Sequence, residues 1–297
     1  MPFTTKATIS SFGGKLYKLT HPSKATGSEM AVNLYLPPQA LSGGSRKVPL
    51  LIYLSGLTCS PENCSEKGFF QHNAAKRGLA IVYPDTSPRG LNLPGEKDSW
   101  DFGEAAGFYI DAQAEPYAEN YKMETYITRD LPDALFSDEE FGKYLDGEKK
   151  VSITGHSMGG HGALSLYLKY PGKYASVSAF APIANPVNCP WGQKAFRGYI
   201  GDGEDKEKEW KEHDSTELVR KWDKGTPLNM LIDVGTGDNF YKQGQLLPEN
   251  FEKAAQEAGV SEGLTVRYQE GYDHSYYFMA SFADEHVDHA AKYLGLL

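Results

Sequence analysis

The sequence predicts an α/β protein in which a mostly parallel central sheet is covered by helices on both faces. Three observations support this prediction. From about residue 48 onward, short apolar segments alternate with segments of helical periodicity, as in repeated strand–helix–strand units. The run 48–54 is continuously apolar, which is typical of a strand buried on both faces. At 151–164, such a strand runs through a glycine-rich turn directly into a helix.

The predicted elements follow in chain order. Residues 7–21 and 29–36 alternate loosely and are broken by glycines, which predicts an opening pair of antiparallel strands. The remaining elements are predicted from apolar runs and helical spacing. We expect strands at 48–54, 79–83, 151–154, 175–181, 228–234 and 264–269, and helices at about 62–76, 121–136, 160–170, 248–258 and 276–293.

Two segments are too long and irregular to be plain connectors. The first insertion, at about 84–120, is rich in Gly, Pro, Asp and aromatic residues and shows no clear period, which indicates a functional loop region. The second covers about 182–225, and its charge-rich run 203–213 predicts a solvated helix or loop. Neither a composition break nor an internal repeat divides the chain, so we expect a single domain over 1–297.

The composition argues against several classes of function. Hydrophobic residues make up 40% of the 297 residues and aromatic residues 12%, as in a compact globular protein. No apolar run is long enough to cross a bilayer, and the N-terminus lacks the apolar core of a signal peptide. We therefore expect a soluble, cytoplasmic protein with no membrane partner. The formal charge of −9 argues against nucleic acid as a partner.

Cysteine and histidine usage gives no sign of a disulfide framework or a metal centre. The three cysteines, Cys59, Cys64 and Cys189, are an odd number in a chain without a secretion signal, which indicates free thiols. The eight histidines are scattered. The pair His286 and His289 fits an exposed face of the last helix better than a pair of metal ligands, so we expect no metal.

The stretch 155–159, Gly-His-Ser-Met-Gly, carries the clearest chemical signal. A serine hydroxyl becomes a nucleophile when a base can reach it, and a sharp strand-to-helix turn projects Ser157 out of the sheet toward a histidine and a substrate. Gly155 and Gly159 leave the space that this turn needs. The same pattern occurs by chance in ordinary glycine-rich turns, but its place between a strand and a helix favours a nucleophile.

The acid and the base of a catalytic triad are expected after the serine, in loops at the carboxyl ends of later strands. Two carboxylates compete for the acid role. Asp233 lies within a predicted strand, whereas Asp238 lies in the turn beyond it, and we favour Asp238. His274 is the predicted base, because His161 shares a helix with the nucleophile and is poorly placed for a later carboxylate. Asp273 adjoins His274 and fits a capping role.

A hydrolase also needs donors for the negative charge that develops on the carbonyl oxygen. The usual donors are the backbone N–H that follows the nucleophile and another in the loop after an earlier strand. Here we expect the N–H groups of Met158 and Leu57 to form this oxyanion hole. The small residues around Leu57 allow its backbone to approach a substrate.

An ordered set of six motifs spans nearly the whole chain. The motifs are Ser-Gly-Leu-Thr-Cys at 55–59, Gly-His-Ser-Met-Gly-Gly-His-Gly-Ala-Leu at 155–164, Ala-Pro-Ile-Ala-Asn-Pro-Val at 181–187, Pro-Trp-Gly-Gln-Lys-Ala-Phe at 190–196, Gly-Asp-Asn-Phe at 237–240 and Gly-Tyr-Asp-His-Ser-Tyr-Tyr-Phe at 271–278. In these motifs the chain resembles the S-formylglutathione hydrolase family, also called esterase D. Six ordered motifs are far more specific than the serine turn alone.

The resemblance implies an α/β-hydrolase fold and the hydrolysis of S-formylglutathione, a small-molecule glutathione thioester, to formate and glutathione in formaldehyde detoxification. It also implies side activity on small carboxylic esters, and a cytoplasmic homodimer without a cofactor. The family's triad falls on Ser157, Asp238 and His274, which are the residues already predicted.

The resemblance also implies residues of the substrate pocket. The family's cysteine beside the oxyanion loop falls on Cys59, and its acyl-pocket region matches Trp191 and Lys194. A site selective for a formyl group needs walls close to the carbonyl carbon, which Trp191 together with Phe108 or Trp100 would provide. Two alternatives remain open, a general carboxylesterase of the same fold and a non-catalytic binding protein. The second is disfavoured because a binding protein need not retain the three triad residues in order.

Overall fold

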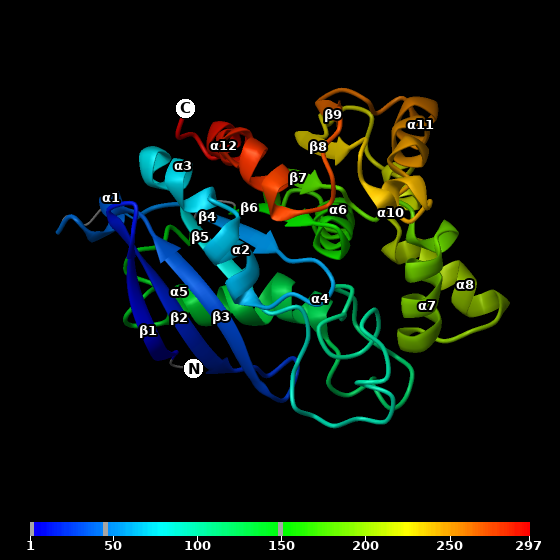
Figure 1. The fold of residues 1–297 in the computed structure, drawn as a ribbon, viewed down its shortest axis with the longest axis horizontal. Helices are drawn as coiled ribbons and strands as arrows, with labels where there is room; N and C mark the ends of the chain where they lie inside the picture. The colour runs from blue at the N-terminus through cyan, green and yellow to red at the C-terminus, as the bar shows by residue number, and fades with distance from the viewer. Residues whose placement is uncertain (1–2, 44–46, 148–150) are drawn as a thin grey trace.

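The computed structural model describes residues 3–43, 47–147 and 151–297. Within these ranges, nine strands form one sheet in the order β1-β2-β3-β5-β4-β6-β7-β8-β9 (Figure 1). The strands are β1 (Thr4–Ser11), β2 (Gly14–Pro22), β3 (Glu29–Leu36), β4 (Leu50–Leu54), β5 (Ala80–Pro84), β6 (Val151–His156), β7 (Tyr174–Phe180), β8 (Met230–Gly235) and β9 (Leu264–Gln269). All neighbours from β5 to β9 pair in parallel, which confirms the predicted mostly parallel sheet.

The N-terminal end of the sheet is antiparallel. The strands β1, β2 and β3 form a meander, and β3 pairs antiparallel with β5. The prediction of two opening strands is wrong, because the first alternating stretch folds back on itself. The chain reverses at Phe12 and Gly13, which have φ of 45° and 76°. This left-handed turn splits the stretch into β1 and β2.

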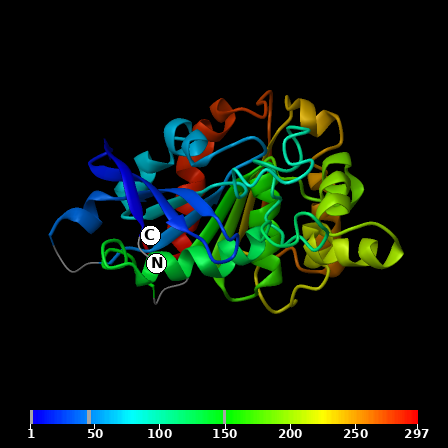
Figure 2. The ribbon, with the colours of Figure 1, turned by 90° about the horizontal axis from the view of Figure 1, so that it is seen from below.

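Helices pack on both faces of the parallel strands (Figure 2). On one side, α6 (Met158–Lys169) packs against β6 and β7. On the other, α12 (Tyr276–Tyr293) crosses β7 and lies beside α3 (Phe70–Arg77), as Figure 1 shows. This arrangement confirms the α/β fold class and brings the chain out of the sheet repeatedly at the carboxyl ends of the parallel strands.

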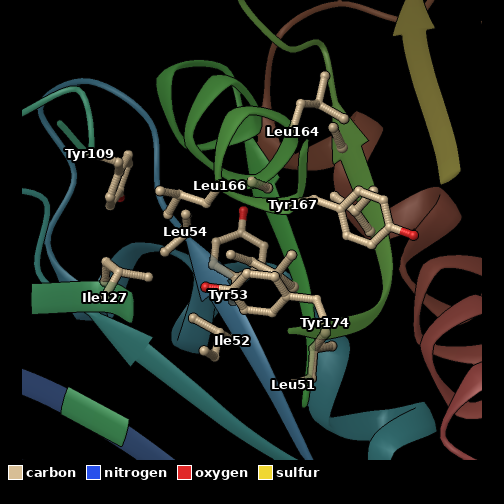
Figure 3. Close-up of a cluster of buried hydrophobic side chains, with 14 of the residues drawn as sticks. Leu51, Ile52, Tyr53, Leu54, Tyr109, Ile127, Leu164, Leu166, Tyr167 and Tyr174 are labelled. Atoms are coloured by element: carbon tan, nitrogen blue, oxygen red, sulfur yellow. The ribbon is translucent and has the colours of Figure 1, made fainter. Parts of the chain in front are cut away.

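The hydrophobic core is centred on β4 and the helices that cover it. All five residues of β4 are at most 1% exposed. Figure 3 shows Leu51, Tyr53 and Leu54 of this strand together with Leu164 and Leu166 of α6. The strand is therefore buried on both faces, as its continuous apolar sequence predicts.

Two predicted helices are interrupted in the structure. The helix expected at 62–76 is divided into α2 (Pro61–Lys67) and α3, because Phe69 between them has a left-handed φ of 59°. The helix expected at 121–136 comprises α4 (Met123–Thr125), the π-helix η1 (Tyr126–Asp130) and α5 (Leu131–Ser137). The wide turn precedes Pro132, which lacks the N–H that an α-helix would use.

The two insertions lie side by side and differ in structure. Residues 85–122 form turns and isolated bridges. The second insertion holds η2 (Pro186–Asn188), α7 (Pro190–Tyr199), α8 (Glu204–Trp210), η3 (Lys211–His213) and α9 (Ser215–Val219). Most of α8 is exposed, which confirms the predicted solvated helix. The insertions meet where the N–H of Gln113 donates to the carbonyl of Tyr199 over 2.7 Å.

Short helices complete the chain, namely α1 (Pro38–Leu41), α10 (Asn239–Lys242) and α11 (Pro248–Ala258). Among the helices that the structure describes, none has both the length and the apolar character needed to span a membrane.

Candidate active site

The turn between β6 and α6 holds Ser157 in a strained conformation. Its backbone has φ 58° and ψ −117°, which side-chain-bearing residues rarely adopt. The surrounding backbone fixes this turn, because the N–H of Ser157 donates to the carbonyl of Phe180 over 2.9 Å and its carbonyl accepts from the N–H of His161 over 3.0 Å. The serine is thereby fixed where the strand ends and the helix begins.

Two glycines give the turn its room. A Cβ added at Gly155 would lie 2.1 Å from the carbonyl oxygen of Gly159. A Cβ added at Gly159 would lie 2.0 Å from the carbonyl oxygen of Leu54 in the neighbouring strand. Both collisions involve backbone atoms that cannot move aside cheaply, so the turn needs glycine at both positions.

Asp238 and His274 meet in the loops that follow β8 and β9. Asp238 is fully buried, and its Oδ2 lies 2.5 Å from Nδ1 of His274. Its Oδ1 accepts hydrogen bonds from the N–H groups of Phe240, over 2.7 Å, and Tyr241, over 3.4 Å, at the start of α10. The carboxylate is thus held by the backbone, and it holds Nδ1 of the imidazole in turn. Among the described residues, no hydrogen bond occupies Nε2 of His274, which leaves this nitrogen to take up a proton.

The other two candidate carboxylates have different partners. Asp233 lies inside β8, where its carboxylate accepts from Arg267 over 2.7 and 2.5 Å and pairs with His286 Nε2 at 2.9 Å. Burial acts to raise the pKa of Asp233, but hydrogen bonds from His286 and Arg267 outweigh it and lower that pKa to about 2. Asp273 accepts from the N–H of Ser275 over 3.0 Å at the start of α12. Of the three, Asp238 contacts His274.

The expectation that His286 and His289 form an exposed face of the last helix is wrong. His286 is fully buried, and its ring stacks on Phe180 with centroids 3.6 Å apart. His289 is half-buried, and its Nε2 donates to the carbonyl of Asn229 over 3.0 Å. The physical reason is that this face of α12 packs on the sheet. Within the described ranges, no group of three or more His, Cys, Asp or Glu side chains is arranged to hold a metal ion.

A cavity of about 230 Å³ opens beside Ser157 and His274. Its walls also contain Gly56, Leu57, Thr58, Cys59, Trp100, His156, Trp191 and Phe240. The structure therefore gathers six of the predicted site residues around one space. Sequence reasoning did not assign His156 and Phe240 to the pocket. The available signal was adjacency, since they lie one residue before Ser157 and two residues after Asp238.

The loop after β4 places backbone donors next to the serine. A Cβ added at Gly56 would lie only 3.2 Å from Cβ of Ser157, so this loop lies directly against the nucleophile turn. In the described part of the chain, the N–H of Leu57 donates to no backbone carbonyl. Met158 is the first residue of α6, so its N–H has no acceptor within the helix. Such a pair of N–H groups can bind an oxyanion.

Cys59 lines the cavity as a buried thiol. Its Sγ lies 3.8 Å from the hydroxyl of Tyr276, and its carbonyl accepts from Thr86 Oγ1 over 2.6 Å and from Arg89 over 2.9 Å. Burial raises the pKa of the Cys59 thiol and outweighs the opposing contact with Tyr276. The thiol is therefore protonated near neutral pH. Cys59, Cys64 and Cys189 are all free thiols, as expected.

Trp100 and Trp191 form the aromatic wall of the cavity. Their rings meet edge to face, with centroids 5.7 Å apart and planes at 89°. Trp191 also packs on Phe240, with centroids 4.7 Å apart. Trp191 is buried, whereas Trp100 is 55% exposed at the mouth. The inner part of the wall is therefore fixed, and the outer part faces solvent.

Lys194 and Phe108 do not line this cavity, which corrects the expectation for both. Lys194 lies almost one turn beyond Trp191 on α7, and its ammonium group forms an ion pair with Asp101 and donates to Ser99 Oγ over 2.9 Å. The Phe108 ring is fully buried against His161. The backbone of Phe108 has φ 50° and that of Tyr109 φ 53°, and both side chains are fully buried.

Comparison with known proteins places the site in a family context. The chain matches the Esterase family, described as "Putative esterase", over residues 23–289. S-formylglutathione hydrolase from Mus musculus is 49% identical over 95% of both chains, and the enzyme of that name from Arabidopsis thaliana is 48% identical over 96% of this chain and 95% of the relative. The Saccharomyces cerevisiae relative of the same name is 45% identical, with 96% and 97% of the two chains covered.

Solved structures agree with the sequence relatives. An S-formylglutathione hydrolase from Agrobacterium tumefaciens superposes with a TM-score of 0.89 at 40% identity and covers 99% of this chain and 100% of that one. The serine hydrolase FphF from Staphylococcus aureus has a TM-score of 0.68 at 18% identity, covering 94% and 98% of the two chains. This second likeness shows the fold alone.

Proposed function

This chain belongs to the S-formylglutathione hydrolase family of esterases, and from that premise we propose that it hydrolyses S-formylglutathione to formate and glutathione. The observation that carries the proposal is full-length similarity combined with a buried Asp238 that contacts His274 beside Ser157. The proposal includes the family's role in formaldehyde detoxification and a side activity on small carboxylic esters. It requires no metal and no cofactor.

In the proposed first half-reaction, Ser157 Oγ attacks the thioester carbonyl carbon while His274 Nε2 takes the hydroxyl proton. Asp238 stabilises the imidazolium that forms. The N–H groups of Leu57 and Met158 stabilise the negative charge on the carbonyl oxygen. When the tetrahedral intermediate collapses, the C–S bond breaks and His274 returns its proton to the glutathione sulfur. A formyl ester on Ser157 remains.

In the second half-reaction, water attacks the formyl ester, and His274 again accepts a proton. The ester bond to Ser157 Oγ then breaks, His274 protonates that oxygen, and formate leaves. The same three residues therefore serve both halves of the cycle. The contact between Asp238 and His274 supports a base that takes up and releases a proton twice per turnover.

The cavity supports a preference for small acyl groups. Trp191 and Phe240 are in contact and form a wall beside Ser157, which limits the room for longer acyl chains. Steric rejection of one methylene contributes about 1–3 kcal/mol, which predicts a graded preference for formyl over acetyl thioesters. Trp100 at the exposed mouth is placed to contact the larger glutathione part.

We also propose a cytoplasmic homodimer, which the family resemblance supports. Size-exclusion chromatography with light scattering on the purified chain tests the oligomeric state. Cell fractionation with a tagged chain tests the compartment.

The substrate is tested by comparing kcat/KM for S-formylglutathione, S-acetylglutathione, S-lactoylglutathione and p-nitrophenyl acetate. We expect S-formylglutathione to give the highest value. The Ser157→Ala variant should lose turnover by a factor on the order of a million while remaining folded. A higher kcat/KM for the lactoyl thioester or the aryl ester would show that the assigned substrate is wrong. A fluorophosphonate adduct on a serine other than Ser157 would overturn the proposed nucleophile.

A further inference from the structure

His156 is a buried residue that lies beside both the loop of Gly56 and the ring of His274. It is the last residue of β6, directly before Ser157, and it lines the cavity while remaining only 6% exposed. Its ring centroid lies 4.5 Å from that of His274, with the planes tilted by 44°. A Cβ added at Gly56, in the oxyanion loop, would lie 3.4 Å from His156 Nδ1. The ring thus lies between that loop and the proposed base.

The nitrogens of His156 lack partners. Neither Nδ1 nor Nε2 makes a hydrogen bond within the described part of the chain, and the His274 backbone is close enough to act on the pKa of the ring. Burial, and then the neighbouring His274, keep the pKa of His156 well below its usual value, so the ring is neutral and carries one N–H donor and one acceptor. A buried donor without a partner costs stability that a phenyl ring would not cost.

The loop that carries His274 has a complementary gap in its hydrogen bonding. Before the histidine, the N–H of Gly271 donates to Thr236 Oγ1 over 3.0 Å, and the carbonyl of Tyr272 accepts from the N–H of Gly237 over 2.8 Å. After it, Ser275 begins α12. Among the described residues, the carbonyl of His274 itself accepts no hydrogen bond. Within the described ranges, the His274 carbonyl therefore lacks a donor, and the neighbouring His156 ring N–H lacks an acceptor.

We propose that His156 is a positioning residue for His274. Its ring N–H donates to the His274 carbonyl when the imidazole of His274 turns toward Ser157, and this hydrogen bond holds the loop during proton transfer. The inference rests on the proposed function, in which His274 is the base. His156 contacts neither the substrate's reacting atoms nor the Asp238 carboxylate, and it acts through the loop alone.

The test compares variants of His156 with and without an N–H, using kcat and KM for p-nitrophenyl acetate and the melting temperature. His156→Phe keeps a ring but removes both nitrogens. We expect its kcat to fall about tenfold to a hundredfold with KM unchanged, which is the effect of a slightly misplaced base. Its melting temperature should equal or exceed that of the parent chain, because an unmet buried donor is removed. A purely structural role would lower the melting temperature instead.

A second pair of variants covers the case in which phenylalanine does not fit. His156→Gln offers an amide N–H, and His156→Met has nearly the same length without one. The glutamine variant should retain a higher kcat than the methionine variant. Tyr83→Phe is the matched control, because the Tyr83 hydroxyl is also buried without a partner among the described residues but lies in β5, outside the cavity. It should leave kcat unchanged.

Two results would overturn the inference. One is an unchanged kcat in His156→Phe, and the other is an equal kcat in the glutamine and methionine variants. Ser157→Ala is assayed in parallel to distinguish a failure of the positioning role from a failure of the proposed function. Turnover by that variant near the parent level would refute the proposed function itself, whereas an inactive Ser157→Ala with a fully active His156→Phe would refute only the positioning role.

Discussion

Replacing Asp238 with asparagine should remove catalysis without unfolding the protein. Asp238 Oδ1 accepts from the N–H groups of Phe240 and Tyr241, and an asparagine oxygen can accept the same two bonds. Asparagine is as good as aspartate at a helix N-cap, so α10 and the fold should persist. Because the oxygen of the amide is held by these N–H groups, its NH₂ must face His274 Nδ1.

The loss follows from the tautomer of His274. An NH₂ group at 2.5 to 3 Å from Nδ1 donates to it, so the ring proton moves to Nε2, where it blocks proton transfer from Ser157. Such a tautomer change costs about 10⁴-fold in kcat, equivalent to about 5 kcal/mol of transition-state stabilisation. The melting temperature should stay near that of the parent chain.

The assay is kcat/KM for S-formylglutathione, with Asp233→Asn and Asp273→Asn as matched controls. Each control changes one carboxylate to an amide, but neither residue contacts the His274 ring. The reasoning fails if Asp238→Asn retains more than about a tenth of the parent activity, or if Asp233→Asn loses as much activity with a normal melting curve.

Three further predictions concern stability, the thiol and the pocket. Because the pKa of Asp233 is lowered to about 2, its ionised form stabilises the fold above about pH 4 by about 2 kcal/mol, and this contribution disappears as the pH falls toward 2. The melting-temperature gap between the parent chain and Asp233→Asn should therefore narrow from pH 6 to pH 2, and a constant gap would contradict the ion-pair explanation. Cys59→Ser should stay active and resist inhibition by a bulky maleimide, whereas a variant as inactive as Ser157→Ala would give the thiol a catalytic role. Trp191→Ala should raise kcat/KM for acyl chains longer than formyl relative to S-formylglutathione, and an unchanged ratio would remove Trp191 from the acyl wall.

The residues of the proposed triad could be chosen from the sequence because their placement is encoded locally. Gly155 and Gly159 indicate the sharp turn around Ser157, and apolar strands directly precede the loops of Asp238 and His274. Parallel strands end at the same edge of a sheet, so three separate loops meet there. This meeting can be predicted without the tertiary structure. The choice between Asp233 and Asp238 also followed from position, since a side chain within a strand faces the sheet's own covering helices.

The pocket residues were harder to predict because long-range packing sets them. Phe108 belongs to an irregular segment and Lys194 to a helix within an insertion, and the direction of both depends on partners far along the chain, as in the stacking of Phe102 on Tyr199 at 4.5 Å. Sequence spacing contains no such information. The burial of His286 was missed for a related reason, because only the packed structure shows which face of α12 covers the sheet.

The junction between the two insertions bears on how this enzyme can be re-engineered. Lys194 on α7 holds Ser99 and Asp101, and the Trp100 and Trp191 rings meet beside them. Each insertion therefore helps to hold the other in place. A loop grafted alone from a different esterase would lack these contacts. A chimaera designed to accept new acyl groups should exchange 84–120 and 182–225 as one unit.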